Sequence, residues 1–102
     1  MGLISGWGRF PRADCAEVMA RSTADISQAG ATSPLIARGN GRAYGDSAMN
    51  TAATLHMTAM DRMLSFDNGV LVAEAGVLLG DIIHTFLPRG WFPFVTPGTK
   101  YV

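Results

Sequence analysis

A glycine- and arginine-rich segment in the middle of the chain restricts the possible folds more than any other feature. It runs from Arg38 to Asp46, reads RGNGRAYGD, and holds three glycines and two arginines in nine residues. The apolar run Pro34–Ala37 comes directly before it and predicts a short buried strand. Glycines let successive backbone amides turn toward one point, and such a concave group of amides binds anions such as phosphate. The sequence therefore predicts a strand that leads into an anion-binding loop.

Two common phosphate-binding motifs do not match the spacing of this loop. A dinucleotide-binding GxGxxG motif would need its third glycine where the chain has Tyr44. A Walker loop would need a lysine after Gly45, where the chain has Asp46. The residues alone therefore leave two interpretations open, a phosphate-binding loop and a glycine-rich surface turn without a ligand.

The first half of the chain is predicted to hold one helix and a second short strand. Asp14 and Glu17 have the spacing of a capping box, and apolar residues recur after them at helical spacing. We expect a helix over residues 14–29, ended by Gly30 in the left-handed conformation. The run Thr54–Met57 follows the loop and predicts the second strand.

A hairpin is predicted in the middle of the chain. The dipeptide Asn68-Gly69 separates the apolar runs 63–67 and 70–73. This dipeptide favours the two-residue turn that joins antiparallel strands, because both of its residues tolerate a positive φ.

The last third of the chain is predicted to hold a helix and a third strand candidate. A broad apolar face begins near Val77, and Pro88 and Gly90 bring that helix to an end. The apolar run Trp91–Val95 follows as the strand candidate. These elements together predict an α/β fold leaning to α+β, with a small mixed sheet and flanking helices.

Composition excludes several classes of function. Eight Lys and Arg residues balance eight Asp and Glu residues, so nothing indicates the basic surface of a nucleic-acid binder. Cys15 is the single cysteine and the chain has two histidines, so we expect neither an internal disulfide nor a metal site. Residues 1–10 lack the pattern of a signal peptide, and no apolar run reaches the length of a membrane span. We therefore expect a soluble, cytoplasmic protein without a membrane span.

The loop resembles the pyrophosphate-binding loop of the PCMH-type, or vanillyl-alcohol-oxidase, FAD-binding family. The match runs over Ile36–Asp46. Three other segments agree with that family and occur in the same order, Ser5–Arg9, Glu74–Val77 and Pro97–Thr99. The resemblance therefore covers essentially the whole chain. It implies that residues 1–102 are part of an FAD-binding domain, its first subdomain, and that the rest of the enzyme lies beyond them.

The resemblance implies a set of cofactor contacts. Residues 37–47 would surround the FAD pyrophosphate through backbone amides, with both loop arginines near it, and Gly98 would approach the flavin. Arg42 stands where relatives that attach flavin covalently have a histidine, so the implied FAD is non-covalent. Ala43 replaces the usual serine, which removes one hydroxyl contact. The implied cofactor-binding residues are Ala37, Arg38, Gly39, Asn40, Gly41, Arg42, Ala43, Tyr44, Gly45, Asp46, Ser47 and Gly98.

The resemblance also implies an activity for the complete enzyme. It would oxidise an alcohol carbon of a sugar-like substrate, such as a polyprenyl-phospho-ribose, and pass the hydride to the flavin. No catalytic residue is expected within this chain. The alternatives are an aldonolactone or alditol oxidase of the same superfamily and a stand-alone nucleotide-binding module without catalysis. As a fragment, the chain should bind FAD weakly or not at all and self-associate through exposed Trp91, Phe92 and Phe94.

Other conspicuous side chains have simpler interpretations. We expect Trp7 to pack under the first helix, although it could instead line a ligand entrance. We expect Cys15 to be a small buried apolar residue and His56 to face solvent or bond a neighbour. Tyr44 could cover the cofactor or pack within the turn. Core filling is the expected role of Met57, Met60 and Met63.

Overall fold

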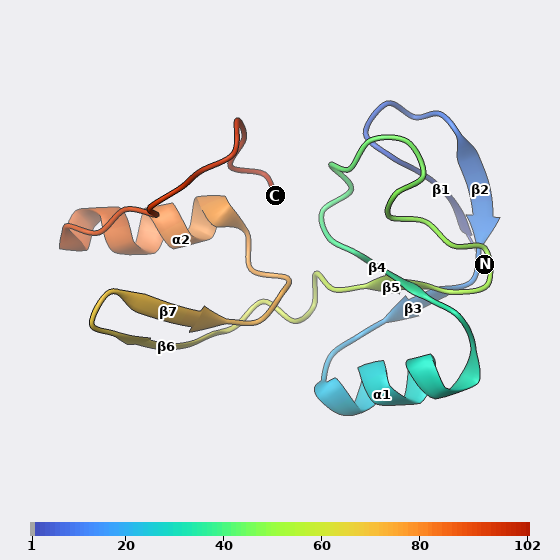
Figure 1. Cartoon of the computed structure of the whole chain (residues 1–102), viewed down its shortest axis with the longest axis horizontal. Helices are drawn as coiled ribbons and strands as arrows, with labels where there is room; N and C mark the ends of the chain where they lie inside the picture. The colour runs from blue at the N-terminus through green and yellow to red at the C-terminus, as the bar shows by residue number, and fades with distance from the viewer. Residues whose placement is uncertain (1) are drawn as a thin grey trace.

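The computed structural model describes residues 2–102, which form three small sheets and two helices. Figure 1 shows them as two groups, one containing β1 to β5 with α1, and the other containing β6, β7 and α2. The predicted mixture of helices and small sheets is confirmed. The elements are β1 (Gly2–Ser5), β2 (Arg12–Cys15), β3 (Glu17–Met19), α1 (Thr23–Thr32), β4 (Ile36–Arg38), β5 (Thr54–His56), β6 (Met63–Asp67), β7 (Val70–Ala73), α2 (Leu79–Phe86) and a 3-10 turn (Leu87–Arg89).

A parallel three-stranded sheet forms the centre of the first group. Its strand order is β3-β5-β4, and α1 connects the two outer strands. The middle strand β5 is the most buried, with Thr54 fully covered and Leu55 only 2% exposed. The Thr54 hydroxyl donates to the Asn50 carbonyl, with an O···O distance of 2.9 Å, so this buried polar group is satisfied. Leu55 packs in the core with Ala20, Met57 and Met60.

The predicted helix over 14–29 is wrong in its position. Residues 12–15 pair with β1 as an antiparallel ladder, and residues 17–19 pair with β5. These ladders provide hydrogen-bond partners for the backbone N–H and C=O groups of both segments. Pairing with distant strands therefore overrides the local capping pattern at Asp14.

Helix α1 uses a different capping sequence. The Ser22 hydroxyl accepts a hydrogen bond from the Asp25 amide at 3.2 Å, and the Asp25 carboxylate accepts one from the Arg21 amide at 2.8 Å. Gly30 lies inside the helix rather than ending it. Ser33 is extended because Pro34 follows it, and the helix therefore ends there.

The predicted hairpin is confirmed as β6 and β7. Asn68 and Gly69 both have positive φ, 51° and 77°, as the two-residue turn requires. The base of the hairpin is closed by Arg62 and Glu74, whose side chains form two hydrogen bonds of 2.8 and 3.2 Å. This pairing lowers the pKa of Glu74 below its ordinary value, mainly because the Arg62 side chain donates to the carboxylate.

The predicted second helix is confirmed, but the third strand is not. Helix α2 continues into the 3-10 turn, which ends at Gly90 with a φ of 87°. Residues 91–95 pair with no strand within residues 2–102. The Trp91 amide instead donates to the Phe86 carbonyl at 3.1 Å, and the Trp91 ring packs edge-on against Phe66. Trp91 therefore covers the end of α2 and the hairpin, whereas Phe92, Phe94 and Val95 are exposed.

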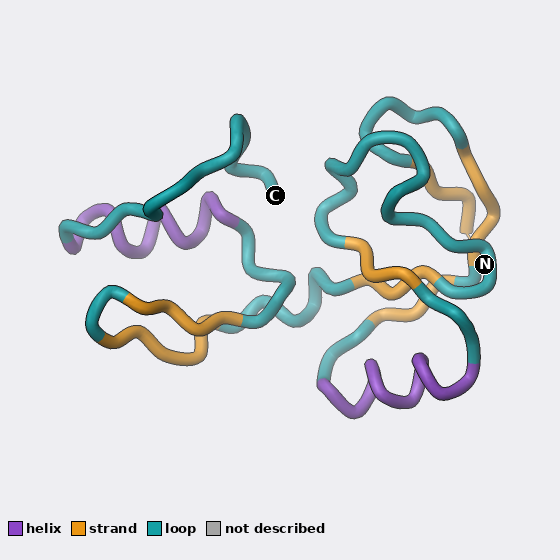
Figure 2. Tube along the Cα trace, viewed as in Figure 1, coloured by secondary structure: helices purple, strands orange, loops and turns teal. Residues whose placement is uncertain are grey.

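The segment after Trp91 returns along the chain to the start of α2. The amides of Leu79 and Gly80 donate to the carbonyls of Val102 and Lys100, with distances of 2.7 and 2.9 Å. Figure 2 shows this last segment as a loop that runs from the far end of α2 back toward the first group. Among residues 2–102, no helix has the length and apolar character needed to cross a membrane.

Candidate functional site

The glycine-rich loop begins where β4 ends. The strand was predicted to be buried, but β4 is an edge strand and Ala37 is exposed. The buried strand is its neighbour β5, which lies between the two outer strands of the sheet. The Met57 amide donates to the Arg38 carbonyl at 2.9 Å, so the start of the loop is fixed to the end of β5.

The backbone amides of the loop are available to a ligand. Within residues 2–102, no amide of residues 39–48 donates a hydrogen bond to a protein acceptor. Gly41 and Gly45 have positive φ, 73° and 60°, a conformation that other residues rarely adopt. A Cβ at Gly39 or Gly45 would meet no protein atom within 4 Å, so both glycines border open space. The loop is therefore not part of a hairpin ladder.

The two loop arginines occupy different environments. Nη2 of Arg38 donates to the Ser5 carbonyl at 2.6 Å, while its Nη1 is buried and has no hydrogen-bond partner within residues 2–102. Arg42 donates from Nη1 to the Asn40 carbonyl at 3.0 Å. Its guanidinium carbon lies 4.7 Å from the centre of the Trp7 ring. Both cations are therefore held in place by contacts that leave some of their donors free.

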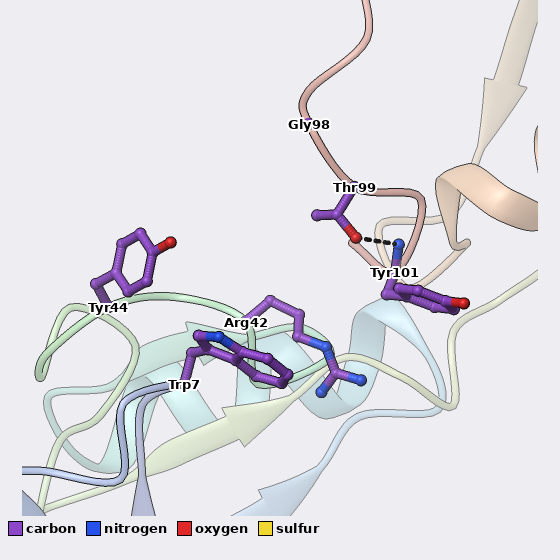
Figure 3. A pocket seen from close by; sticks show the side chains of 6 residues that line it. All are labelled: Trp7, Arg42, Tyr44, Gly98, Thr99 and Tyr101. Atoms are coloured by element: carbon purple, nitrogen blue, oxygen red, sulfur yellow. Dashed lines mark hydrogen bonds between the residues drawn. The ribbon is translucent and has the colours of Figure 1, made fainter.

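A cleft of about 590 Å³ lies between the loop and the last residues of the chain. Figure 3 shows Trp7 and Arg42 side by side at one edge of the cleft and Thr99 and Tyr101 at another. The side-chain amide of Asn40 donates to the Tyr101 carbonyl at 3.0 Å and links the two sides. The residues that line the cleft are Trp7, Arg42, Tyr44, Gly98, Thr99 and Tyr101.

The cleft contains three residues of the predicted site and three that the prediction missed. Arg42, Tyr44 and Gly98 were predicted, and the structure brings them together. Tyr44 is 78% exposed, so it does not pack within the turn. Thr99 and Tyr101 were missed because only the overall folding of the chain places them opposite the loop.

Trp7 does not pack under the first helix as expected. It is 55% exposed and lines the cleft, which corresponds to the other interpretation of this residue. The glycines on both sides of Trp7 were the available signal, because they allow the backbone to lie against the loop.

The remaining predicted residues do not line the cleft with their side chains. Asn40 bonds to the last segment as described, and the Ser47 hydroxyl donates to the Tyr44 carbonyl at 2.9 Å. Asp46 borders a separate hollow beside Met49 and Asn50. Any contact of these residues, or of Ala37 and Ala43, with a ligand in the cleft would involve the backbone.

These residues fit a ligand that contains a diphosphate. Free amides and an arginine provide hydrogen-bond donors and positive charge at one place. Arg38 adds an observation of its own, since a buried guanidinium nitrogen without an acceptor is costly. Arg38 does not line the cleft and this nitrogen is buried, so a phosphate oxygen would supply that acceptor only after the Arg38 side chain turned toward the loop.

Other candidate residues have structural roles. Cys15 is fully buried, as expected, but in strand β2 rather than in a helix. His56 bonds a neighbour, with 2.8 Å between its Nε2 and Oε1 of Glu17. Met57 and Met60 are buried, as core residues should be, whereas Met63 is half-buried at the start of β6.

Two comparisons with known proteins agree with this geometry. The family model described as FAD binding domain matches residues 16–102. The chain is also similar to decaprenylphosphoryl-beta-D-ribose oxidase from Mycolicibacterium smegmatis, with 36% identity over 110 residues. That alignment covers 97% of this chain and 24% of the relative, so the chain spans about a quarter of the relative's length. The chain therefore belongs to the PCMH-type FAD-binding domain family.

Proposed function

We propose that this chain is the first part of the FAD-binding domain of a flavin-dependent oxidoreductase. In this proposal, residues 37–47 and Gly98 hold FAD, with the loop amides on its pyrophosphate. The observation that carries the proposal is the set of unpaired amides over residues 39–48, beside two fixed arginines. The family match to residues 16–102 supports FAD as the ligand.

The proposed reaction is oxidation of an alcohol carbon on a sugar-like substrate. FAD, when bound, supplies the acceptor for the hydride that leaves this carbon. The residues of this chain bind and orient the cofactor, and none of them is proposed to act on the substrate. A decaprenylphosphoryl-ribose-like substrate is the specific proposal, supported by the name of the relative with 36% identity.

The proposed cofactor is held without a covalent bond to the loop. An arginine stays protonated at any accessible pH, so Arg42 offers no lone pair that could attack a flavin carbon. Its guanidinium, fixed by Trp7 and by the Asn40 carbonyl, is instead a charged donor beside the free amides. A charge-assisted hydrogen bond of this kind contributes about 1.5 to 3 kcal/mol to stability or binding.

FAD retention by the longer protein that contains this chain tests the proposal. We expect wild-type protein to purify with FAD and the Arg42→Ala variant to bind FAD about 10- to 100-fold more weakly, since it loses one charge-assisted hydrogen bond. Arg89→Ala is the matched control, because Arg89 lies in the 3-10 turn and not at the loop. After acid precipitation the flavin should be free in the supernatant for both proteins. Protein that purifies without FAD, or flavin that remains attached to a peptide containing Arg42, would contradict the proposal.

A further inference from the structure

The end of β1 and the residues that follow it, Ser5–Trp7, lie against the glycine-rich loop. Two hydrogen bonds join them at well-separated points of the loop. The Ser5 carbonyl accepts from Nη2 of Arg38 at 2.6 Å, and the Trp7 amide donates to the Ala43 carbonyl at 2.8 Å. The segment therefore holds the loop both where it begins and near its tip.

Gly6 allows this close approach. A Cβ at Gly6 would overlap the carbonyl oxygen of Gly45 and lie 2.7 Å from that of Ala43. Both neighbours are backbone atoms, so they could not move without moving the loop itself. The two backbones can thus lie in contact only while residue 6 has no side chain.

The Trp7 side chain adds a third contact, to the charged group of the loop. The guanidinium of Arg42 lies over its ring at 4.7 Å, within the range of a cation–π interaction. The Asn40 carbonyl accepts from the same guanidinium at 3.0 Å. Figure 3 shows the Arg42 side chain extended along the Trp7 ring. Arg42 is therefore fixed in direction before any ligand arrives.

Residues 5–7 lie outside the part of the chain that the family model matches. That match begins at residue 16, whereas Ser5, Gly6 and Trp7 precede it and are connected to it through β2. The β1–β2 hairpin thus precedes the residues that the family model matches.

We propose that Ser5–Trp7 is a clamp that preorganises the loop for the cofactor, and that Trp7 is the positioning residue for Arg42. The part of this inference that concerns FAD rests on the proposed function. The physical basis is that a loop already ordered in the free protein loses less conformational entropy when it binds. The clamp supplies that order by hydrogen bonds and stacking from outside the loop.

Two substitutions of Trp7 distinguish the contribution of its aromatic face from that of its side-chain volume. Trp7→Phe keeps an aromatic face for the guanidinium, whereas Trp7→Leu introduces an apolar side chain close in size to Phe but without an aromatic face. Phe10→Leu is the matched control, because Phe10 is an exposed aromatic residue of the same segment and does not line the cleft.

The first readout needs no cofactor. In the wild-type chain, the side-chain protons of Arg42 should have NMR shifts moved by the Trp7 ring current, and the amides of residues 39–47 should have high order parameters of about 0.85. In Trp7→Leu the ring-current shift should vanish and the order parameters should fall toward about 0.6. Trp7→Phe and Phe10→Leu should resemble the wild type. The dispersed amide signals of β3, β4 and β5 serve as the check that each variant is folded.

The second readout is the response of the loop amides to added FAD. We expect the initial slope of the Gly41 amide shift against FAD concentration to fall about three- to tenfold in Trp7→Leu and to stay within about twofold in Trp7→Phe. Unchanged order parameters and an unchanged Arg42 shift in Trp7→Leu would overturn the clamp. If the loop loses its order in Trp7→Leu but its response to FAD stays the same, the clamp has no role in FAD binding. In the longer protein that contains this chain, ordered loop amides that do not respond to FAD would instead contradict the proposed function and leave the clamp standing.

Discussion

At the scale of single residues, the loop depends on glycines that have different physical tasks. Gly41 has a φ of 73°, and a Cβ there would lie 3.1 Å from Nη2 of Arg38. Gly39 does not have a positive φ, and a Cβ there would meet no protein atom within 4 Å. The positive φ at residue 41 and the nearby Arg38 side chain therefore both favour glycine there. No contact within the protein requires glycine at residue 39.

The paired variants Gly41→Ala and Gly39→Ala test this difference. We expect Gly41→Ala to lower the free energy of unfolding by about 1 to 2 kcal/mol, because an alanine is strained in the left-handed conformation. We expect Gly39→Ala to leave it unchanged or raise it by up to about 1 kcal/mol, since it restricts the unfolded chain. Urea denaturation followed by circular dichroism measures both values. Equal destabilisation by the two substitutions would show that the assigned backbone conformations are wrong.

At the scale of elements, the hairpin is closed by the pair Arg62 and Glu74. Besides their side-chain hydrogen bonds, the Glu74 amide donates to the Arg62 carbonyl at 2.9 Å. Glu74 ends the hairpin and leads into the turn before α2, so the pair fixes the direction in which the chain leaves the hairpin.

This pair predicts a dependence of stability on pH. Arg62 lowers the pKa of Glu74 from its ordinary value of 4.5. A carboxylate whose pKa is lower in the folded state stabilises that state above its unfolded pKa, and this contribution is lost as the pH falls through the folded pKa. We therefore expect Glu74→Gln to lower the urea midpoint at pH 7 and to have a smaller effect at pH 3. Glu17→Gln, on β3, is a comparison at a different carboxylate. A Glu74→Gln effect that is the same at both pH values would contradict the assigned ion pair.

The elements that the sequence predicts correctly are those fixed by local contacts. Asn68 and Gly69 determine their turn by their own conformational preferences, and Gly90 ends its helix in the same way. The first helix was misplaced because residues 12–15 pair with β1, a choice that local periodicity cannot reveal.

The predicted site shows the same division between local and distant contacts. The loop was recognised from its own residues, whereas its clamp and the far side of the cleft come from distant segments. Arg38 and Ser5 are 33 residues apart, and Asn40 and Tyr101 are 61 apart. Such contacts follow from the folded topology and leave no periodic signal in the sequence.

At the scale of the whole molecule, the chain has more surface than a compact domain of its size. Its radius of gyration is 15.2 Å, compared with about 13 Å for a typical domain of 100 residues. Its accessible surface is 6860 Å², whereas a compact monomer of 10.8 kDa has about 5,500 Å². The difference, about 1,400 Å², exceeds the roughly 800 Å² that one partner buries in a standard protein–protein interface.

Apolar side chains contribute to this exposed surface. Phe92, Phe94 and Val95 after α2 are exposed, as are Val70 and Val72 on the hairpin. We expect further polypeptide to cover this face in the proposed enzyme, and self-association of the isolated chain remains a prediction. A cofactor bound to the chain alone would therefore have only part of its contacts, and its affinity should be low.

The central claim is that the unpaired amides of the loop bind the FAD pyrophosphate. Titration of the isotope-labelled chain with FAD, ADP and adenosine, followed by amide NMR shifts, tests it most directly. FAD and ADP should shift the amides of Gly39, Gly41 and Gly45 with dissociation constants of about 1 mM or weaker, and adenosine, which has no phosphate, should not. If shifts appear only outside residues 39–48, or if adenosine produces the same shifts as ADP, the loop does not bind the pyrophosphate and the claim is wrong.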